Sequence, residues 1–252
     1  QPFLLSAMRT LGIRRPVLIV GQAQALPLIA ALDPALCIYH CSDELASVSG
    51  FPSSYASMEE DLMTICDLVI ATSAQLAAAK KLFHSKVLTV PNAADYHHFS
   101  RVVGEHSTIP ADLQRIRRPI IGYVGSMYEW LDYALVRELA AHRPEWSFVF
   151  VGPGQMDQAA ELTGIANVHF LGPVQYEQVP RYLQGFEVAW IPFSYHDVTM
   201  KASPIKFYEY LAAGRPTVAT RLPDLEQFSD VAHLVSTSSE FLEAIAVALE
   251  ED

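Results

Sequence analysis

The chain has 252 residues, 51% of them hydrophobic, which is enough to bury one large core or two ordinary ones. Its formal net charge of −11 excludes a bulk electrostatic attraction for nucleic acid, so we expect no nucleic-acid partner. No apolar run in the sequence approaches the roughly 20 residues that span a bilayer.

The cysteines and the amino-terminal residues bear on the cellular compartment. Cys37, Cys41 and Cys66 are an odd number of thiols without a second metal-binding pair, which predicts free thiols in a reducing, cytoplasmic compartment. Residues 1–11 are apolar but short and lack a basic leading region, so we do not expect a signal peptide. Because the first residue is Gln rather than Met, we expect a trimmed or partial polypeptide.

The first half alternates short β-branched runs with helical stretches, a rhythm typical of a parallel sheet covered by helices. We expect strands at 17–20, 37–40, 68–72 and 87–90, and helices at 25–32, 57–66 and 74–83. Residues 92–119 have little periodicity, and we place the linker at 101–118. The prediction is therefore a partial Rossmann-like domain at 1–100, which should face the acceptor, and a second domain at 119–252.

The second half has a more complete pattern. We expect strands at 120–124, 148–151, 168–171, 188–191, 217–220 and 233–235, and helices at 131–142, 155–163, 176–184, 203–213, 222–228 and 239–250. Six such units make a doubly wound α/β sheet. Right-handed crossovers place a ligand beyond the carboxyl ends of its strands, so the loops after the strands carry the candidate site.

One helix has clear sequence signals at both ends. Ser203 is a suitable N-cap and Pro204 a suitable first residue, while Gly214 and Pro216 end the helix. We expect an apolar stripe to pack against the sheet, made of Ile205, Tyr208, Leu211 and Ala212.

The same helix carries Lys206 and Glu209, three residues apart and therefore on one face. Lys206 lies in the first turn, where free amides and the helix dipole favour a phosphate. Glu209 lies about 4.5 Å further along the axis, where a carboxylate can accept ribose hydroxyls. The alternative is an ordinary surface ion pair.

Glycines follow two of the expected strands. Gly125-Ser126 ends the first strand of the second half, where the backbone can approach a diphosphate. Gly152-Pro-Gly154 is only a partial dinucleotide fingerprint, since position 157 is Asp. For either loop taken alone, a simple tight turn is the favoured interpretation.

Five ordered runs of the second half resemble the carboxyl-terminal half of GT-B-fold retaining glycosyltransferases, the group 1 or family 4 enzymes of bacterial exopolysaccharide and lipopolysaccharide synthesis. The runs are Pro-Ile-Ile-Gly-Tyr-Val-Gly-Ser (119–126), Trp-Ser-Phe-Val-Phe-Val-Gly-Pro-Gly (146–154), Asn-Val-His-Phe-Leu-Gly-Pro-Val (167–174), the pair 179–184 and 188–193, and the helix 203–216. In the first half, 58–75 and 90–99 are similar to the helix-strand-helix and hinge segments of that family.

The resemblance implies two Rossmann-like domains, the amino-terminal one incomplete, and a donor site. It implies that Glu209 binds the ribose, that Lys206 and the Gly125-Ser126 loop face the diphosphate, and that Gly172 to Val174 border the base. Ser203 joins the donor-binding set at the helix start. The resemblance implies no metal and no cofactor, only a nucleotide-diphosphate sugar as co-substrate. A saccharide or lipid-linked saccharide acceptor and peripheral contact with the inner face of the membrane also follow.

Two departures from the family pattern concern Lys201 and length. The family often has a glutamate eight positions before the one at 209, and here that position is Lys201, which either adds charge at the diphosphate or is simply solvent-exposed. Typical members also have roughly 90 more residues at the amino end.

The first half contributes candidates for contact with the transferred sugar. His40 and Asp43 follow an expected strand and, by the resemblance, face the cleft as catalytic groups together with Lys206. The alternatives are a buried core histidine and a helix N-cap.

The sequence therefore predicts a metal-independent, retaining hexosyltransferase of polysaccharide synthesis. A nucleotide-sugar 2-epimerase of the same fold and a truncated module that only binds nucleotide remain as alternatives. A nicotinamide-dependent dehydrogenase is disfavoured, because Glu177, the acid 25 residues after Gly152, falls beyond another strand.

Overall fold

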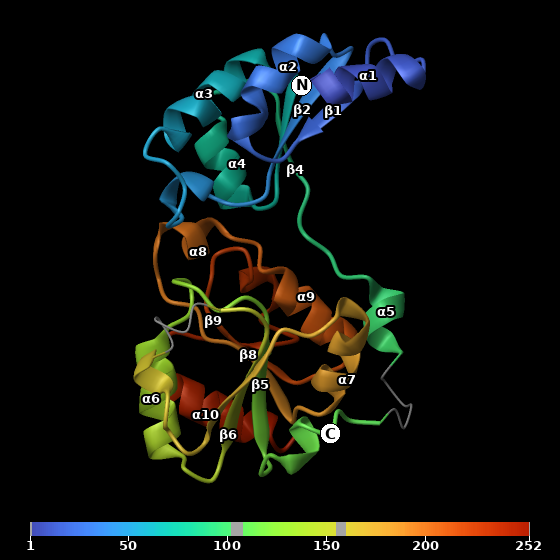
Figure 1. Cartoon of the computed structure of the whole chain (residues 1–252). Helices are drawn as coiled ribbons and strands as arrows, with labels where there is room; N and C mark the ends of the chain where they lie inside the picture. The colour runs from blue at the N-terminus through green and yellow to red at the C-terminus, as the bar shows by residue number, and fades with distance from the viewer. Residues whose placement is uncertain (1, 102–107, 155–159, 252) are drawn as a thin grey trace. The chain divides into compact units, whose positions relative to one another are not determined.

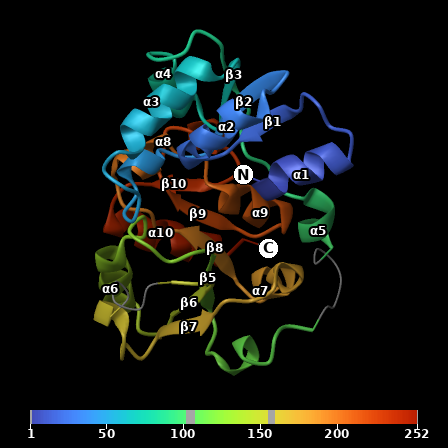
Figure 2. The ribbon, with the colours of Figure 1, turned by 45° about the horizontal axis from the view of Figure 1, so that its top comes forward.

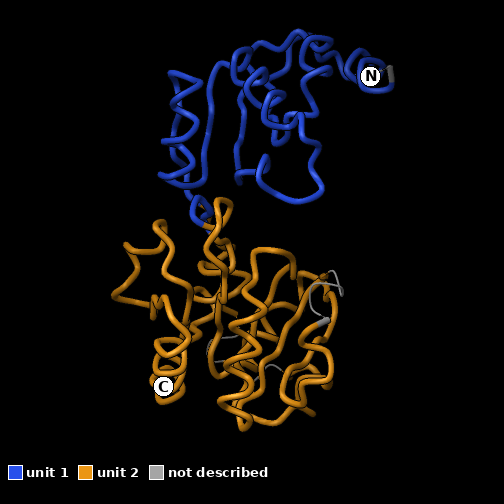
Figure 3. The backbone as a smooth tube through the Cα atoms, turned by 90° about the vertical axis from the view of Figure 1, so that its left-hand side faces the viewer, with its two compact units in different colours: residues 1–91, 200–203 blue, residues 92–199, 204–252 orange. Residues whose placement is uncertain are grey.

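The computed structural model describes residues 2–101, 108–154 and 160–251 and divides the chain into two compact units (Figure 3). Unit 1 comprises residues 1–91 and 200–203, and unit 2 comprises residues 92–199 and 204–252. The division falls after Pro91, whereas the sequence-based domain extends to residue 100. The short helix α5 (Tyr96–Ser100) belongs to unit 2 because it contacts α7 and α9 and buries Phe99 in the core of that unit.

Unit 1 is a four-stranded parallel sheet in the order β1-β2-β3-β4. All the strands expected in the first half are confirmed, with bounds β1 (Val17–Val20), β2 (Leu36–Cys41), β3 (Leu68–Ala71) and β4 (Val87–Thr89). The expected helices are confirmed as α2 (Leu26–Leu32), α3 (Tyr55–Ile65) and α4 (Ala74–Lys80), and α1 (Pro2–Thr10) is an additional one.

The two faces of the unit 1 sheet differ in burial. On one face, alternate side chains of the strands, such as Tyr39 and Val69, are fully buried against residues of α3 and α4. The β1 residues that point to the opposite face are largely exposed, 59% for Val17 and 71% for Ile19. Because parallel sheets are usually covered on both faces, unit 1 has an unusually small core for its fold.

Unit 2 is a six-stranded parallel sheet in the order β10-β9-β8-β5-β6-β7. All six expected strands are confirmed, with bounds β5 (Ile120–Val124), β6 (Ser147–Val151), β7 (Val168–Gly172), β8 (Val188–Ile191), β9 (Thr217–Thr220) and β10 (His233–Val235). The strand order reverses between β5 and β8, which is the position where doubly wound sheets bind ligands. Strands β5, β6, β8 and β9 are buried along their whole length, as expected for a sheet covered on both faces.

The helices of unit 2 form two groups (Figures 1 and 2). One group is α6 (Tyr133–His142) with α10 (Ser238–Ala248), and the other is α5 with α7 (Val179–Gln184) and α9 (Ile205–Ala212). The short helix α8 (Asp197–Lys201) crosses from unit 2 into the 200–203 segment of unit 1. Within the described ranges, no helix is long and apolar enough to cross a membrane.

Two expected helices differ from the structure. The helix expected at 222–228 is wrong, because this stretch holds only a 3₁₀ turn at Glu226–Phe228, three residues after Pro223. The helix expected at 155–163 lies partly outside the described residues, and Ala160–Leu162 is a 3₁₀ turn.

Candidate functional site

Glycine loops from three neighbouring strands of unit 2 lie against one another at the carboxyl edge of the sheet. The Gly125 N–H donates to the Val151 carbonyl at 2.9 Å, and the Gly152 N–H donates to the Gly172 carbonyl at 2.8 Å. A methyl group on Gly152 would come within 2.1 Å of the Gly125 carbonyl oxygen, and the φ of Gly152 is +144°. Only glycine permits this approach, so the loops after β5, β6 and β7 form one backbone surface.

The Gly125-Ser126 loop is fixed by two side chains. The Tyr123 hydroxyl and the Trp130 indole N–H each donate to the Ser126 carbonyl at 3.0 Å. Burial raises the pKa of Tyr123 well above its usual value, so its hydroxyl stays protonated and able to donate. Such a preorganised loop suits a diphosphate that must approach backbone amides closely.

Helix α9 brings Lys206 and Glu209 to this loop. Lys206 Nζ lies 3.0 Å from Glu209 Oε2, and a methyl group on Gly125 would lie 3.2 Å from Lys206 Cε. Glu209 is only 4% exposed, so the pair is not the exposed surface ion pair that the sequence left open. Burying a carboxylate is costly unless it is paired. The buried pair is therefore stronger evidence for a functional site than the three-residue spacing of Lys206 and Glu209 alone.

Two details of α9 differ from expectation. The N-cap is Pro204, with an extended ψ of 109°, so the helix begins at Ile205 and Ser203 is not its cap. The predicted apolar stripe is right only in part: Leu211 and Ala212 pack against the core, but the fully buried residues are Phe207, Tyr210 and Ala213, and Ile205 is 42% exposed. The helix start is therefore shifted by one residue and its buried face is aromatic.

The loop after β7 holds the two residues predicted to border a base. Gly172 has a φ of +74°, and Val174 is half-buried against the core. Two residues further on, the Tyr176 carbonyl lies 3.0 Å from His98 Nε2, and the two rings stack with centroids 4.4 Å apart. Helix α5 thus holds this loop in place, a contact between distant segments that no local pattern signals.

His40 and Asp43 lie in unit 1. His40 is half-buried on β2, paired with Ile70 of β3. Burial raises the pKa of Asp43, and a hydrogen bond from Ser42 offsets this only in part. The alternative role of Asp43 as a helix cap is wrong, because the N-cap of the next 3₁₀ turn is Glu44.

Unit 1 also holds a buried charge network that sequence reasoning missed. Lys80 Nζ lies 3.1 Å from Glu44 Oε1 and 3.0 Å from Glu59 Oε2, and all three residues are buried. The Tyr39 hydroxyl donates to Glu59 Oε1 at 2.5 Å. The one available signal was a lysine ending the alanine-rich stretch 74–80 and followed by another, which by itself indicates only an exposed helix end.

Lys201 and Ser203 belong to the 200–203 segment of unit 1. Lys201 Nζ lies 3.0 Å from Glu44 Oε2, and its side chain is 26% exposed. The alternative of a simply solvent-exposed Lys201 is therefore wrong, and Ser203 is itself buried.

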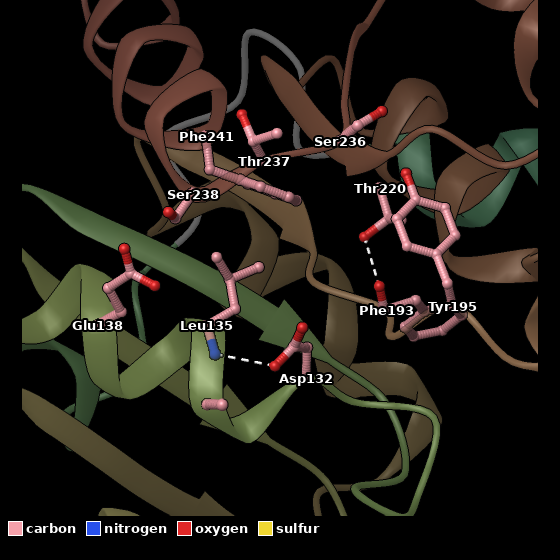
Figure 4. Close-up of a pocket in the computed structure, with 11 residues that line it drawn as sticks. Asp132, Leu135, Glu138, Phe193, Tyr195, Thr220, Ser236, Thr237, Ser238 and Phe241 are labelled. Carbon is pink, nitrogen blue, oxygen red and sulfur yellow. Dashed lines mark hydrogen bonds between the residues drawn. The ribbon is translucent and has the colours of Figure 1, made fainter.

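A separate cavity of about 220 Å³ opens on unit 2 at the carboxyl ends of β8, β9 and β10 (Figure 4). Its lining mixes hydroxyl, carboxylate and aromatic side chains, including Asp132, Tyr195, Ser238 and Phe241. Asp132 caps α6 by accepting from the Leu135 N–H at 2.8 Å. None of its lining residues is among those the sequence singled out.

Comparison with known proteins bears on the family of the chain. The model of the family Glycosyl transferases group 1 matches residues 118–251, more than half of the chain. TuaH of Bacillus subtilis (strain 168), named as a teichuronic acid biosynthesis glycosyltransferase, is 27% identical over 202 residues, which is 74% of this chain. The chain spans 50% of the length of TuaH.

Solved structures of low sequence identity share the fold. HepE of Anabaena, in complex with UDP and glucose, matches with a TM-score of 0.72 and 16% identity over 99% of this chain and 72% of its own. Sucrose-phosphate synthase of Thermosynechococcus elongatus matches with a TM-score of 0.78 and 16% identity over 98% of this chain and 67% of its own. Both support the GT-B architecture of two Rossmann-like sheets. On the match to its second half, the chain belongs to the family Glycosyl transferases group 1.

Proposed function

We propose that the chain is part of a glycosyltransferase that moves a sugar from a nucleotide-diphosphate sugar to an acceptor hydroxyl in bacterial polysaccharide synthesis. The acceptor we propose is a saccharide or a lipid-linked saccharide. The observation that carries the proposal is the buried Glu209 paired with Lys206 directly over the Gly125 loop. Family membership supports it, as does the role in polysaccharide synthesis for which TuaH is named.

In this proposal the diphosphate binds where positive charge and free amides converge. Lys206 lies in the first turn of α9, whose N-cap Pro204 supplies no side-chain hydrogen bond to the helix amides. A diphosphate bound here would meet the ammonium, the helix N-terminus and the Gly125-Ser126 backbone. As the glycosidic bond breaks, negative charge grows on the leaving diphosphate, and these fixed donors stabilise it without a metal ion.

Glu209 is the proposed ribose ligand. One of its oxygens holds Lys206 at 3.0 Å, and a carboxylate has further lone pairs to accept two hydroxyl groups. Gly172 and Val174 border the base, and Ser203 completes the donor-binding set. We assign His40 and Asp43 to the sugar side. Asp43, whose pKa burial raises, is suited to exchange a proton with a sugar hydroxyl.

Calorimetric titration of nucleoside diphosphates tests the donor site, with UDP first because HepE structures contain it. We expect UDP or another nucleoside diphosphate to bind in the presence of EDTA. Glu209→Gln should weaken binding at least about tenfold, because the amide loses the charge that pairs with Lys206 and orders the ribose. Glu243→Gln, an exposed glutamate in α10, is the matched control and should leave binding unchanged.

Product analysis separates the proposed reaction from an epimerase. A transferase releases nucleoside diphosphate in proportion to a new glycosidic bond, and retention predicts that the anomeric configuration of the donor persists in the product. An epimerase changes the sugar without an acceptor. Indifference of the protein to every nucleoside diphosphate would overturn the donor-site proposal.

A further inference from the structure

The segment 200–203 is attached to unit 1 at two points, although unit 2 residues flank it on both sides. The Lys201 ammonium pairs with Glu44 Oε2 at 3.0 Å. The Lys201 carbonyl oxygen accepts a hydrogen bond from the Ser73 hydroxyl. Ser73 also caps α4, because its Oγ accepts the Leu76 N–H at 3.0 Å. One attachment uses the side chain and the other the backbone, so the segment is held in both position and orientation.

Glu44 is a strong anchor because it is itself part of the buried network. It is only 8% exposed, and its other carboxylate oxygen pairs with Lys80, which in turn pairs with Glu59. Two acids and two bases alternate in the order Lys201, Glu44, Lys80, Glu59, so the network is formally neutral. Breaking an ion pair of a buried network is costly in free energy, because it leaves a buried charge without its partner.

The residue after this segment is Pro204, the N-cap of α9, and α9 carries Lys206 and Glu209. We infer that Lys201 is a positioning residue that, through Glu44, holds the segment 200–203 from which α9 begins, and that it does not bind the donor diphosphate. Its ammonium already neutralises a buried carboxylate and is not available as a free charge. The inference rests on the proposed function only in assigning the donor site to α9.

The inference separates nucleotide affinity from turnover. In Lys201→Met we expect the Kd for UDP to stay within about twofold, because the charged groups proposed to bind the nucleotide, Lys206 and Glu209, pair with each other and not with Lys201. We expect kcat for sugar transfer to fall about tenfold or more while the donor KM changes little, because the helix start is no longer held. Glu44→Gln should show the same pattern.

A double-mutant cycle tests whether the two residues act together. Lys201→Met combined with Glu44→Gln should be no worse than either single variant, since each breaks the same link. Lys201→Arg keeps the charge and should restore most of the turnover. Lys81→Met, which removes an exposed lysine of unit 1, is the matched control and should leave all parameters unchanged.

A direct role at the diphosphate predicts a different result. In that case Lys201→Met weakens UDP binding at least about tenfold, Glu44→Gln leaves UDP binding intact, and the two effects on turnover multiply. Weakened UDP binding in Lys201→Met, or effects on turnover that multiply in the double variant, would overturn the inference.

Hydrogen exchange keeps the test independent of the proposed reaction. We expect the amides of residues 200–206 to exchange at least about tenfold faster in Lys201→Met and Glu44→Gln, with the Lys81→Met control unchanged. If the wild-type protein binds no nucleotide and transfers no sugar, the proposed function fails while this measurement still decides the anchor. If the amides of residues 200–206 exchange at the wild-type rate in Lys201→Met, the positioning role of Lys201 is wrong even when the enzyme is active.

Discussion

The Tyr210 hydroxyl is hydrogen-bonded to both backbone groups of Val124, accepting from its N–H at 2.8 Å and donating to its carbonyl at 3.2 Å. Val124 is the last residue of β5 and directly precedes Gly125. One buried hydroxyl therefore fastens the middle of α9 to the strand end from which the Gly125-Ser126 loop begins. This link couples the position of Lys206 and Glu209 to that of the loop they face.

Replacing Tyr210 by Phe should weaken both stability and nucleotide binding. The variant leaves a buried N–H and a buried carbonyl without their partner, which costs about 1–3 kcal/mol in the free energy of unfolding. Urea denaturation followed by tryptophan fluorescence measures the loss, and UDP titration should show weaker binding. Tyr96→Phe, at an exposed tyrosine, should change neither quantity. A Tyr210→Phe protein as stable as wild type would contradict the coupling.

The close approach of the glycine loops gives a second prediction. Gly152→Ala should destabilise the protein more than Gly164→Ala. Both residues have positive φ, at +144° and +89°, so both substitutions carry backbone strain of about 1–2 kcal/mol. Only at Gly152 does the added methyl also meet a backbone atom, at 2.1 Å, whereas Gly164 has open space around it.

The difference between these two glycine variants isolates the contact between the loops after β5 and β6. We expect Gly152→Ala to abolish UDP binding under conditions where Gly164→Ala binds as wild type does. Thermal unfolding and calorimetry measure the two effects. If Gly152→Ala and Gly164→Ala lower the free energy of unfolding equally, the loops after β5 and β6 can separate without a measurable loss of stability.

The strands were predictable because their signal is local. Runs such as Phe148 to Val151 are continuously apolar and β-branched or aromatic, as required of strands buried on both faces. The resemblance to group 1 glycosyltransferases implied that Lys206 and the Gly125 loop face the same ligand, and the structure brings the two together. Sequence reasoning therefore located the carboxyl edge of unit 2 and the helix that faces it.

The failures concern features that depend on distant residues. The stripe predicted for α9 left out Phe207 and Tyr210, the two aromatic residues of this helix that are fully buried, because the buried face depends on the space that the rest of the fold provides. The environment of Lys201 depends on Glu44, which is 157 residues away in sequence. The sequence pattern around Lys201 cannot predict this ion pair, because the strength of the pair depends on burial that exists only in the folded protein.

Asp43 gives a prediction about pH. Burial is the main cause that raises its pKa in the folded state, so the folded protein keeps this proton to higher pH than the unfolded chain, whose Asp pKa is about 3.9. As pH rises from below that value through the folded pKa, the unfolded state loses the proton first, and stability falls. The cost is complete above the folded pKa and absent at lower pH.

Asp43→Asn removes this cost. The variant should therefore be more stable than wild type at pH 7 and should lose that advantage below about pH 4. Its rate of sugar transfer should fall by about tenfold or more, because the amide cannot exchange a proton with a sugar hydroxyl. Denaturation across pH 3–7 and a transfer assay measure the two effects, with the exposed Asp61→Asn as the control. Reduced stability at pH 7 would contradict the sign.

The two units carry separate natural probes of unfolding. Cys37, Cys41 and Cys66 are the only cysteines in the sequence, and all three are buried in unit 1. The three tryptophans, Trp130, Trp146 and Trp190, all belong to unit 2. Burial raises the pKa of Cys41 to about 12 and that of Cys66 to about 11, so at pH 8 the folded protein should resist thiol reagents.

We expect thiol labelling to reach its midpoint at a lower urea concentration than the change in tryptophan emission. The reason is the uncovered face of the unit 1 sheet, where Val17, Ile19 and Leu88 are exposed and add little to the core, while the central strands of unit 2 are buried throughout. Coincident midpoints would mean that the units unfold together. Lys80→Met distinguishes these cases, because it leaves the buried Glu59 carboxylate without its lysine and Glu44 with Lys201 alone, at a cost of about 3–5 kcal/mol. If the units unfold separately, this variant moves the thiol transition to lower urea and leaves the tryptophan transition where it was.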